Sequence, residues 1–198
     1  HDASGNIYLG LLTLSDFSAR LVKISPSGSV LASNSFRRFS GFNPFHITYE
    51  DNQLYFAGSF NPNSSINSTL LIATVNPNTL TIVDETSLGG YSGAHKVAKR
   101  PGGNLFVSCL TLNNNYYNGN LLRAKTAGSD FAPYVLELNP LTLQPIWATY
   151  WDDNVSIADM ALDMNGGIYF AGDYSGSNNN FTFTSSALKS VSVPGQYD

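Results

Sequence analysis

The chain has 198 residues, of which 42% are hydrophobic and 12% charged, with a formal net charge of −4. This apolar content supports a packed core and excludes a disordered chain. Lysine and arginine form no cluster, which excludes a nucleic-acid-binding surface, and no run reaches the ~20 apolar residues of a membrane span. Cys109 is the single cysteine, so neither an internal disulfide nor a Cys-based zinc site is expected. No cofactor or metal is predicted.

Four short apolar strands recur along the chain, each after a small turn, at residues 5–10, 53–58, 103–108 and 167–172. Their central aromatics are Tyr8, Tyr55, Phe106 and Tyr169, so the spacing is 47 to 63 residues. A unit that repeats at this period is typical of stacked sheets such as propeller blades.

Each recurring strand has predicted neighbours in the same order. One strand precedes it, at 45–49, 95–99 and 156–162, and one follows it and ends in a turn at Ser25-Pro26, Asn76-Pro77 or Asn139-Pro140. Proline presets φ at the first corner of that turn, and Asn or Ser caps it. A further strand follows at 29–33, 80–85 and 144–150.

The sequence therefore predicts an all-β fold, a single β-propeller domain of four-stranded antiparallel blades, with units at about 1–44, 45–93, 94–154 and 155–198. No segment has helical periodicity, although the insertion 111–133 is long enough to contain a short turn.

The predicted strands number three, four, four and two in successive units, so both end blades are incomplete. Three interpretations are open. The chain can be a fragment of a larger propeller, which we favour. It can be a four-bladed ring completed by strands at Phe181–Ser185 and Leu188–Val193. Finally, its edges can accept a strand from a neighbouring molecule, so that subunits polymerise.

Asparagine sequons suggest where the chain resides. Four N-x-[ST] sites occur in polar stretches, at Asn63, Asn67, Asn154 and Asn180. Together with the low charge and the lone thiol, they predict a glycosylated extracellular or cell-surface protein.

Three polar residues lie in or beside the strands predicted to line the propeller channel: His46, His95 and Asp159. If they converge, they could bind a divalent cation or act as acid and base. Aligning the units puts His46 and His95 one residue out of register, which means opposite faces of a strand. The favoured interpretation is therefore partly buried histidines bonded to backbone.

Aromatic residues in stretches rich in Gly, Asn and Ser form a second set of candidates. Rings flanked by amides can stack on sugar faces or pack blade tops and protein interfaces. These candidate ligand-binding residues are Tyr91, Tyr116, Tyr117, Trp151 and Tyr174.

The segments Asp2-Ala3-Ser4-Gly5-Asn6-Ile7-Tyr8-Leu9-Gly10 and Asp163-Met164-Asn165-Gly166-Gly167-Ile168-Tyr169-Phe170-Ala171-Gly172 resemble the D-x-x-G-N-x-Y-x-x-G core of the SBBP-type β-propeller repeats. The second and third units depart from this pattern, with Asp51-Asn52-Gln53 and Arg100-Pro101-Gly102-Gly103 at the turn. The resemblance implies a propeller and extracellular display, and it supplies no catalytic residues.

Two functions follow as hypotheses. The first is a non-enzymatic extracellular module with a structural, adhesive or assembly role, whose partners are other protein subunits or surface glycans, and which can form a homo-oligomer or filament through its blade edges. The alternative is a carbohydrate-active hydrolase or lyase with His46, His95 and Asp159 at the central channel.

Overall fold

The computed structural model describes residues 1–13, 18–38, 45–60, 69–89, 91–111, 121–123, 132–150, 155–165 and 167–174. Within these ranges the chain forms four separate β-sheets and no helix. Sheet 1 contains β1 (Ile7–Thr13), β2 (Ser18–Ile24) and β3 (Val30–Arg38). Sheet 2 contains β4 (His46–Glu50), β5 (Gln53–Phe60), β6 (Thr69–Val75) and β7 (Ile82–Gly89). Sheet 3 contains β8 (Tyr91–Lys99), β9 (Leu105–Thr111), β10 (Leu121–Arg123), β11 (Ala132–Leu138) and β12 (Pro145–Tyr150). Sheet 4 contains β13 (Val155–Leu162) and β14 (Ile168–Tyr174).

The sheets follow the predicted repeat. Strand orders are β1-β2-β3, β4-β5-β6-β7, β10-β12-β11-β9-β8 and β13-β14, and all neighbouring strands except β10 and β12 are antiparallel. The prediction of an all-β fold with antiparallel sheets is confirmed. The strand β10 was not predicted. It lies in the insertion 111–133, where we expected at most a short turn, and it pairs in parallel with β12 as a fifth strand of sheet 3.

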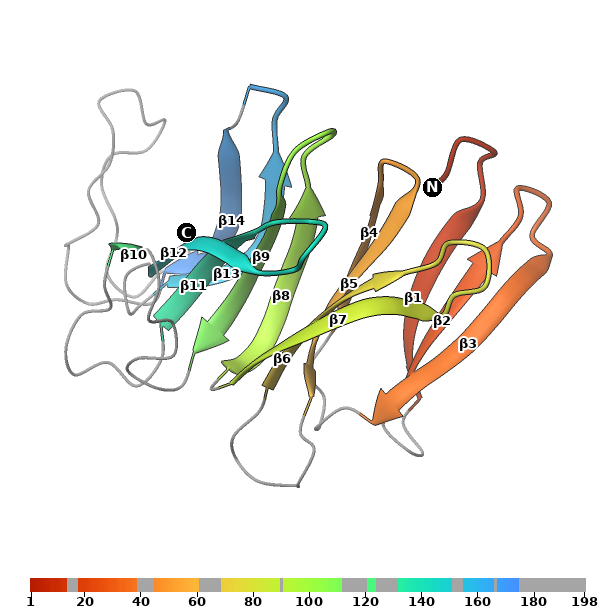
Figure 1. The fold of residues 1–198 in the computed structure, drawn as a ribbon, viewed down its shortest axis with the longest axis horizontal. Coiled ribbons are helices and arrows are strands. Elements are labelled where there is room, and N and C mark those ends of the chain that lie inside the picture. The colour runs from red at the N-terminus through yellow and green to blue at the C-terminus, as the bar shows by residue number, and fades with distance from the viewer. Residues whose placement is uncertain are drawn as a thin grey trace.

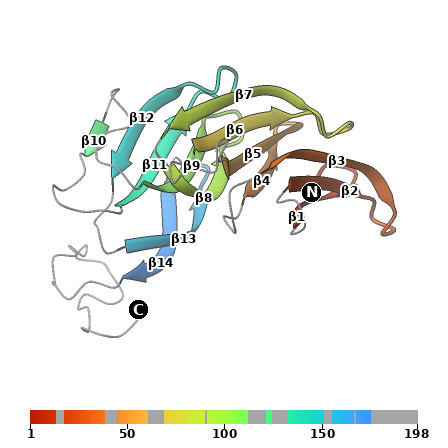
Figure 2. The same ribbon diagram turned by 90° about the horizontal axis from the view of Figure 1, so that it is seen from below.

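The sheets lie side by side in chain order along a curved row, with sheet 1 and sheet 4 at opposite ends (Figures 1 and 2). Among the described residues the row does not close into a ring. The first strands of sheets 2, 3 and 4, which are β4, β8 and β13, contact one another in succession. These three strands therefore bring one edge of each sheet to a shared central region.

Each sheet has two faces with different neighbours. We call the face toward the preceding sheet its leading face and the face toward the following sheet its trailing face. In the end sheets 1 and 4 the same names apply to the faces at the equivalent repeat positions. Between sheets 1 and 2, Ala19 and Leu21 of a trailing face pack on Leu54 and Phe56 of a leading face. Apolar side chains thus fill the space between sheets, which explains why the strands of sheets 2 and 3 read as near-continuous apolar runs.

The core between sheets 2 and 3 repeats this arrangement. Tyr55 and Ala57 of the trailing face of sheet 2 share a buried cluster with Leu105, Val107 and Cys109 of the leading face of sheet 3. Burying a large apolar side chain stabilises a fold by about 1.5–3 kcal/mol. The stacking of sheets, rather than any one sheet, therefore provides most of the apolar burial.

The Asn-Pro turns are capped as the sequence predicts. The side-chain oxygen of Asn76 accepts hydrogen bonds from the N–H groups of Asn78 and Thr79, at 2.8 and 3.1 Å. The turn then ends on a residue that sequence reasoning missed: Leu80 has a positive φ of 57° and is fully buried. The equivalent Leu143 has a φ of 54° and is also buried. Burial of the leucine side chain offsets the strain of a left-handed backbone.

Gly10 marks a close approach between sheets 1 and 2. A Cβ placed on Gly10 would lie 2.5 Å from a ring carbon of Phe45, much closer than two carbons can pack. Phe45 in turn packs on Phe56, with ring centroids 5.2 Å apart. The glycine that ends the first recurring motif is therefore required by inter-sheet packing.

Candidate functional site

Three polar residues occupy equivalent positions on the central strands. His46 pairs with Ala57, Lys96 with Ser108 and Asp159 with Ala171, and each partner lies two residues after the recurring aromatic of its unit. The Lys96 ammonium lies 2.7 Å from the Asp159 carboxylate, and both side chains are partly exposed. The repeat thus brings residues from three sheets to one region.

The charge balance of this cluster keeps Asp159 ionised. The pKa of its carboxyl is below the usual value, first because of the Lys96 ammonium and then because the N–H of Met160 donates to it at 2.8 Å. The nearby His46 lowers this pKa further. An ionised carboxylate that already pairs with a lysine can bind a cationic or hydroxyl group, but it is not a proton donor at neutral pH.

His95 lies at a β-bulge. The pairing of β8 with β9 shifts register between Ala94 and Lys96, so Lys96 takes the position equivalent to His46. The side chain of His95 lies outside the described part. Of the predicted set, the structure brings His46 and Asp159 into one electrostatic cluster with Lys96, which sequence reasoning missed. Among the described residues, no group of three or more His, Cys, Asp or Glu is placed to hold a metal ion.

A second polar feature joins sheets 2 and 3. The nearly buried ammonium of Lys99 bonds to the carboxylate of Asp51 and, at 3.1 Å, to the carbonyl of Arg100. The Gly102 N–H donates to the same carboxylate at 2.9 Å. The Lys99 ammonium and the Gly102 N–H lower the pKa of Asp51. These groups line an open cavity of about 600 Å³ with Tyr55, Val83 and Leu141.

The Lys99–Asp51 bond fixes the position of one turn against another. Asp51 has a positive φ of 52°, in the turn between β4 and β5, and Lys99 ends β8 in the next sheet. Both donors bond the same oxygen of Asp51, one from the end of β8 and one from the turn that follows it. We therefore assign this pair to sheet-to-sheet alignment.

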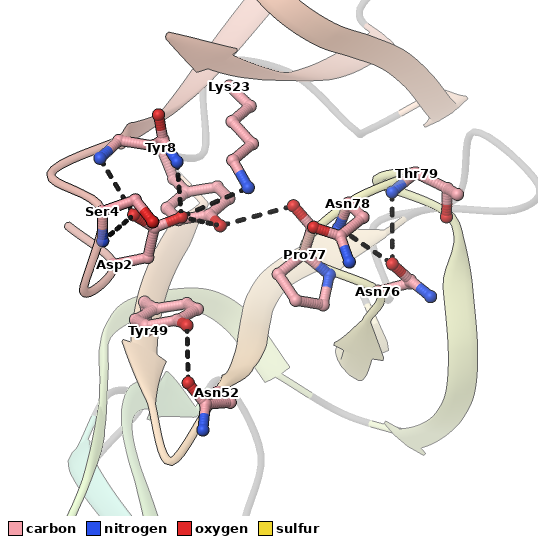
Figure 3. Close-up of polar contacts among 11 residues, drawn as sticks. Asp2, Ser4, Tyr8, Lys23, Tyr49, Asn52, Asn76, Pro77, Asn78 and Thr79 are labelled. Carbon is pink, nitrogen blue, oxygen red and sulfur yellow. Dashed lines mark hydrogen bonds and ion pairs between the residues drawn. The ribbon is translucent and has the colours of Figure 1, made fainter. Parts of the chain in front are cut away.

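The third polar cluster lies at the first turn of the chain (Figure 3). One oxygen of Asp2 accepts the N–H groups of Ser4 and Asn6, at 3.0 and 2.9 Å. The other accepts the hydroxyl of Tyr8 at 3.0 Å and lies 3.2 Å from the Lys23 ammonium. Asp2 thereby closes the turn and ties it to two strands.

The pKa values of this cluster follow from its contacts. Hydrogen bonding from the Asn6 side chain is the main cause that lowers the pKa of Asp2, although burial opposes it. Burial alone would lower the pKa of Lys23, but its bonds to Tyr8 and Asp2 raise that pKa overall. Tyr8 also stacks on Tyr49 of sheet 2, with ring centroids 5.2 Å apart. The cluster is a structural junction between sheets 1 and 2.

The same bonds recur at the last described turn. One oxygen of Asp163 accepts the N–H groups of Asn165 and Gly167, at 2.8 and 2.7 Å, and the other accepts the hydroxyl of Tyr169 at 2.9 Å. The D-x-x-G-N-x-Y spacing is therefore explained by an aspartate that caps a turn and bonds a tyrosine. Sequence analysis noted the spacing but missed the Asp–Tyr bond.

The remaining predicted residues fall in three places. Tyr91 begins β8 and Tyr174 ends β14, so both belong to strands and not to loops, and their side chains are outside the described part. Tyr116, Tyr117, Trp151 and all four sequons, Asn63, Asn67, Asn154 and Asn180, lie outside the described residues. Cys109 is buried in the core between sheets 2 and 3, where burial raises its pKa.

The end sheets present apolar faces that sequence analysis did not single out. Ile7, Leu9 and Leu11 on the leading face of sheet 1 are 48%, 38% and 47% exposed. Their equivalents are buried: Leu54 and Phe56 in sheet 2, and Leu105 and Val107 in sheet 3. Tyr169, on the trailing face of sheet 4, is 60% exposed, whereas the equivalent Tyr55 is buried. The repeat could have revealed these apolar faces, because equivalent positions in the four sheets have the same apolar character.

No family model matches the chain, and no curated protein is significantly similar to it. Within the described ranges, no helix is long and apolar enough to cross a membrane. The functional conclusion therefore depends on the geometry of this chain.

Proposed function

We propose that the chain is an extracellular, non-enzymatic module of β-propeller type, whose sheets are successive blades and whose role is structural, adhesive or assembly-forming. The observation that carries this proposal is the exposed row of Ile7, Leu9 and Leu11, in a position that is buried in the next two sheets. A contiguous exposed apolar patch of this kind marks an interaction surface.

The blade interpretation is supported by repetition. Sheets 2 and 3 have the same strand order through four antiparallel strands. The leading face of sheet 2 packs on sheet 1, and the leading face of sheet 3 packs on sheet 2. The central strand β8 contacts both β4 and β13, as the innermost strands of neighbouring blades do. The curved row in Figure 2 bends in one direction, which continued repetition would carry around an axis.

The polar clusters support a structural role. The carboxylates of Asp2, Asp51 and Asp163 each accept hydrogen bonds that hold a turn. These hydrogen bonds come from the chain itself and hold parts of the fold together. The sequons and the low charge support extracellular display.

Cell fractionation tests this proposal. Native protein is expected in the surface or extracellular fraction, and a Leu9→Lys variant expressed in its place is expected to be shed into the medium. Val83→Lys is the matched control, because Val83 is a strand residue, 65% exposed, that lies on sheet 2 away from the end faces. Intracellular protein, or equal retention of Leu9→Lys and Val83→Lys, would contradict the proposal.

The cluster of His46, Lys96 and Asp159 favours a second candidate, a carbohydrate-active enzyme with its site between the central strands. Asp159 would serve there as a charge stabiliser, because its lowered pKa keeps it ionised. Release of reducing ends from a panel of polysaccharides, lost in Asp159→Asn, would support this candidate. No release by the native chain would remove it.

A further inference from the structure

We propose that the trailing face of sheet 4 packs on the leading face of sheet 1 of a second copy, so that chains join head to tail. The proposal deepens the assembly role and rests on the proposed function. It names the partner, a second copy of this chain, and the two faces that meet.

The internal interfaces show which faces are complementary. Where sheet 1 meets sheet 2, trailing Tyr8 and Leu21 share a cluster with leading Leu54 and Phe56. Where sheet 2 meets sheet 3, trailing Tyr55 and Ala57 share one with leading Leu105 and Val107. Within the described chain, one kind of interface is therefore built twice from equivalent repeat positions.

Among the described residues, no sheet of the same chain covers the leading face of sheet 1 or the trailing face of sheet 4. Sheet 1 offers a leading face in which Leu9 lies opposite Val22 and Ile7 opposite Ile24. Sheet 4 offers a trailing face in which Tyr169 lies opposite Ala161 and Ala171 opposite Asp159. Tyr169, Ala171 and Ala161 are exposed, and they match the trailing residues of sheets 1 and 2 in position.

In the part of the chain that the structure describes, sheet 4 does not pack on sheet 1 of the same chain. Figures 1 and 2 place sheet 1 and sheet 4 at opposite ends of the row, with sheets 2 and 3 between them. A second copy can present sheet 4 to sheet 1 by the same relation that joins consecutive sheets within one chain. This contact is heterologous, so it generates either an open polymer with a free face at each end or a closed ring with none.

Charge is compatible with this contact. Exposed Arg20 lies opposite Leu11 on the leading face of sheet 1, and Asp159 lies on the trailing face of sheet 4. Arg20 contributes a positive charge to one face, whereas Asp159 on the other face is paired with Lys96 of its own chain. Like-charge repulsion between these two residues does not oppose the union.

Sedimentation velocity with two single variants tests the proposal. The native chain should form species that grow with concentration. Leu9→Lys blocks the leading face and Ala171→Lys the trailing face, and each alone should be monomeric, with association weakened about 30-fold or more. Val83→Lys should associate as the native chain does. Urea unfolding of each variant checks that these exposed substitutions leave the fold intact.

Mixing the two variants gives the decisive result. An equimolar mixture of Leu9→Lys and Ala171→Lys should form a dimer and nothing larger, because only one intact pair of faces remains. A native chain that is monomeric throughout, single variants that still associate, or a mixture that stays monomeric would each overturn the proposal. If the native chain is monomeric but Leu9→Lys is still shed from cells, head-to-tail joining is wrong and the surface role stands.

Discussion

The hydroxyl of Tyr8 donates a 3.0 Å hydrogen bond to the carboxylate of Asp2, and Tyr169 makes the same bond to Asp163 at 2.9 Å. In both turns the tyrosine follows the aspartate by six residues. The first aspartate also pairs with Lys23, which lies opposite Tyr8 on β2. A recurring sequence motif is thus a recurring turn closure, to which sheet 1 adds a buried ion pair.

Tyr8→Phe tests this closure. The variant keeps the ring stacked on Tyr49 and removes only the hydroxyl that bonds Asp2. We expect a loss of about 1 kcal/mol in the free energy of unfolding, since a single hydrogen bond contributes roughly that much. Urea unfolding measures it. Asp2→Asn should cost more than Tyr8→Phe, because it leaves the buried Lys23 ammonium without its carboxylate. The reverse order would contradict this assignment.

Acid should destabilise the fold. The pKa values of Asp2, Asp51 and Asp159 lie below the ordinary value of 3.8 in the folded chain. Groups with lowered pKa values stabilise the folded state at a pH above the unfolded value, and this contribution is lost as pH falls through the folded pKa. As the pH is lowered from 7, the midpoint temperature of thermal unfolding should stay constant down to about pH 4 and fall below that pH. Asp51→Asn should flatten part of this drop, and an unchanged profile would count against the Lys99 assignment.

Gly10→Ala tests the close approach of sheets 1 and 2. The new methyl group would meet the Phe45 ring, so we expect destabilisation of about 1–3 kcal/mol from overpacking. Because Phe45 is the obstacle, the cost of Gly10→Ala should shrink in a Phe45→Leu background. A double-mutant cycle by urea unfolding measures this coupling, and additive effects would show that the two residues do not meet.

Leu80→Gly separates backbone strain from burial. Glycine removes the penalty of a positive φ, about 1–2 kcal/mol, but it also deletes a fully buried side chain worth roughly 2–5 kcal/mol. We therefore expect net destabilisation, measured by chemical unfolding. Leu141→Gly in the equivalent Asn139-Pro140 turn is the control. Leu141 is 85% exposed, so this substitution should change the free energy of unfolding little. A stabilised Leu80→Gly would mean that strain outweighs packing.

Cys109 should be unreactive in the folded chain. Its thiol is buried, its pKa is raised by burial, and its sulfur contacts the Tyr134 carbonyl at 3.6 Å. Thiol titration with a chromogenic disulfide should therefore be slow in native buffer and fast in urea. Rapid labelling of the native chain would contradict the position of β9 in the core.

Sequence patterns predicted most strands because each repeat encodes them locally. Recurring aromatics, alternating apolar residues and Asn-Pro turns placed thirteen of the fourteen described strands near their observed bounds, and among these fourteen only β10 was missed. β10 has three residues and pairs in parallel with a strand distant in sequence. A segment so short has no periodicity to detect, and its pairing is set by tertiary contact.

The candidate site was less predictable, because it depends on register across sheets. A single inserted residue at the bulge between Ala94 and Lys96 puts lysine, not histidine, beside Asp159. A bulge leaves no unambiguous sign in sequence, yet it exchanges the faces of a strand. The Lys99–Asp51 bond is likewise a contact between residues 48 apart, which no local pattern specifies.

By itself the sequence determined the all-β class, the repeat and the turns, because these follow from alternation, proline geometry and side-chain capping over a few residues. The tertiary structure alone decided which faces are buried and which are left exposed. Ile7 and Leu54 are both apolar residues at the same repeat position, yet one is exposed and the other is buried. The difference is the presence of a neighbouring sheet, and apolar burial is a property of that packing and not of the residue.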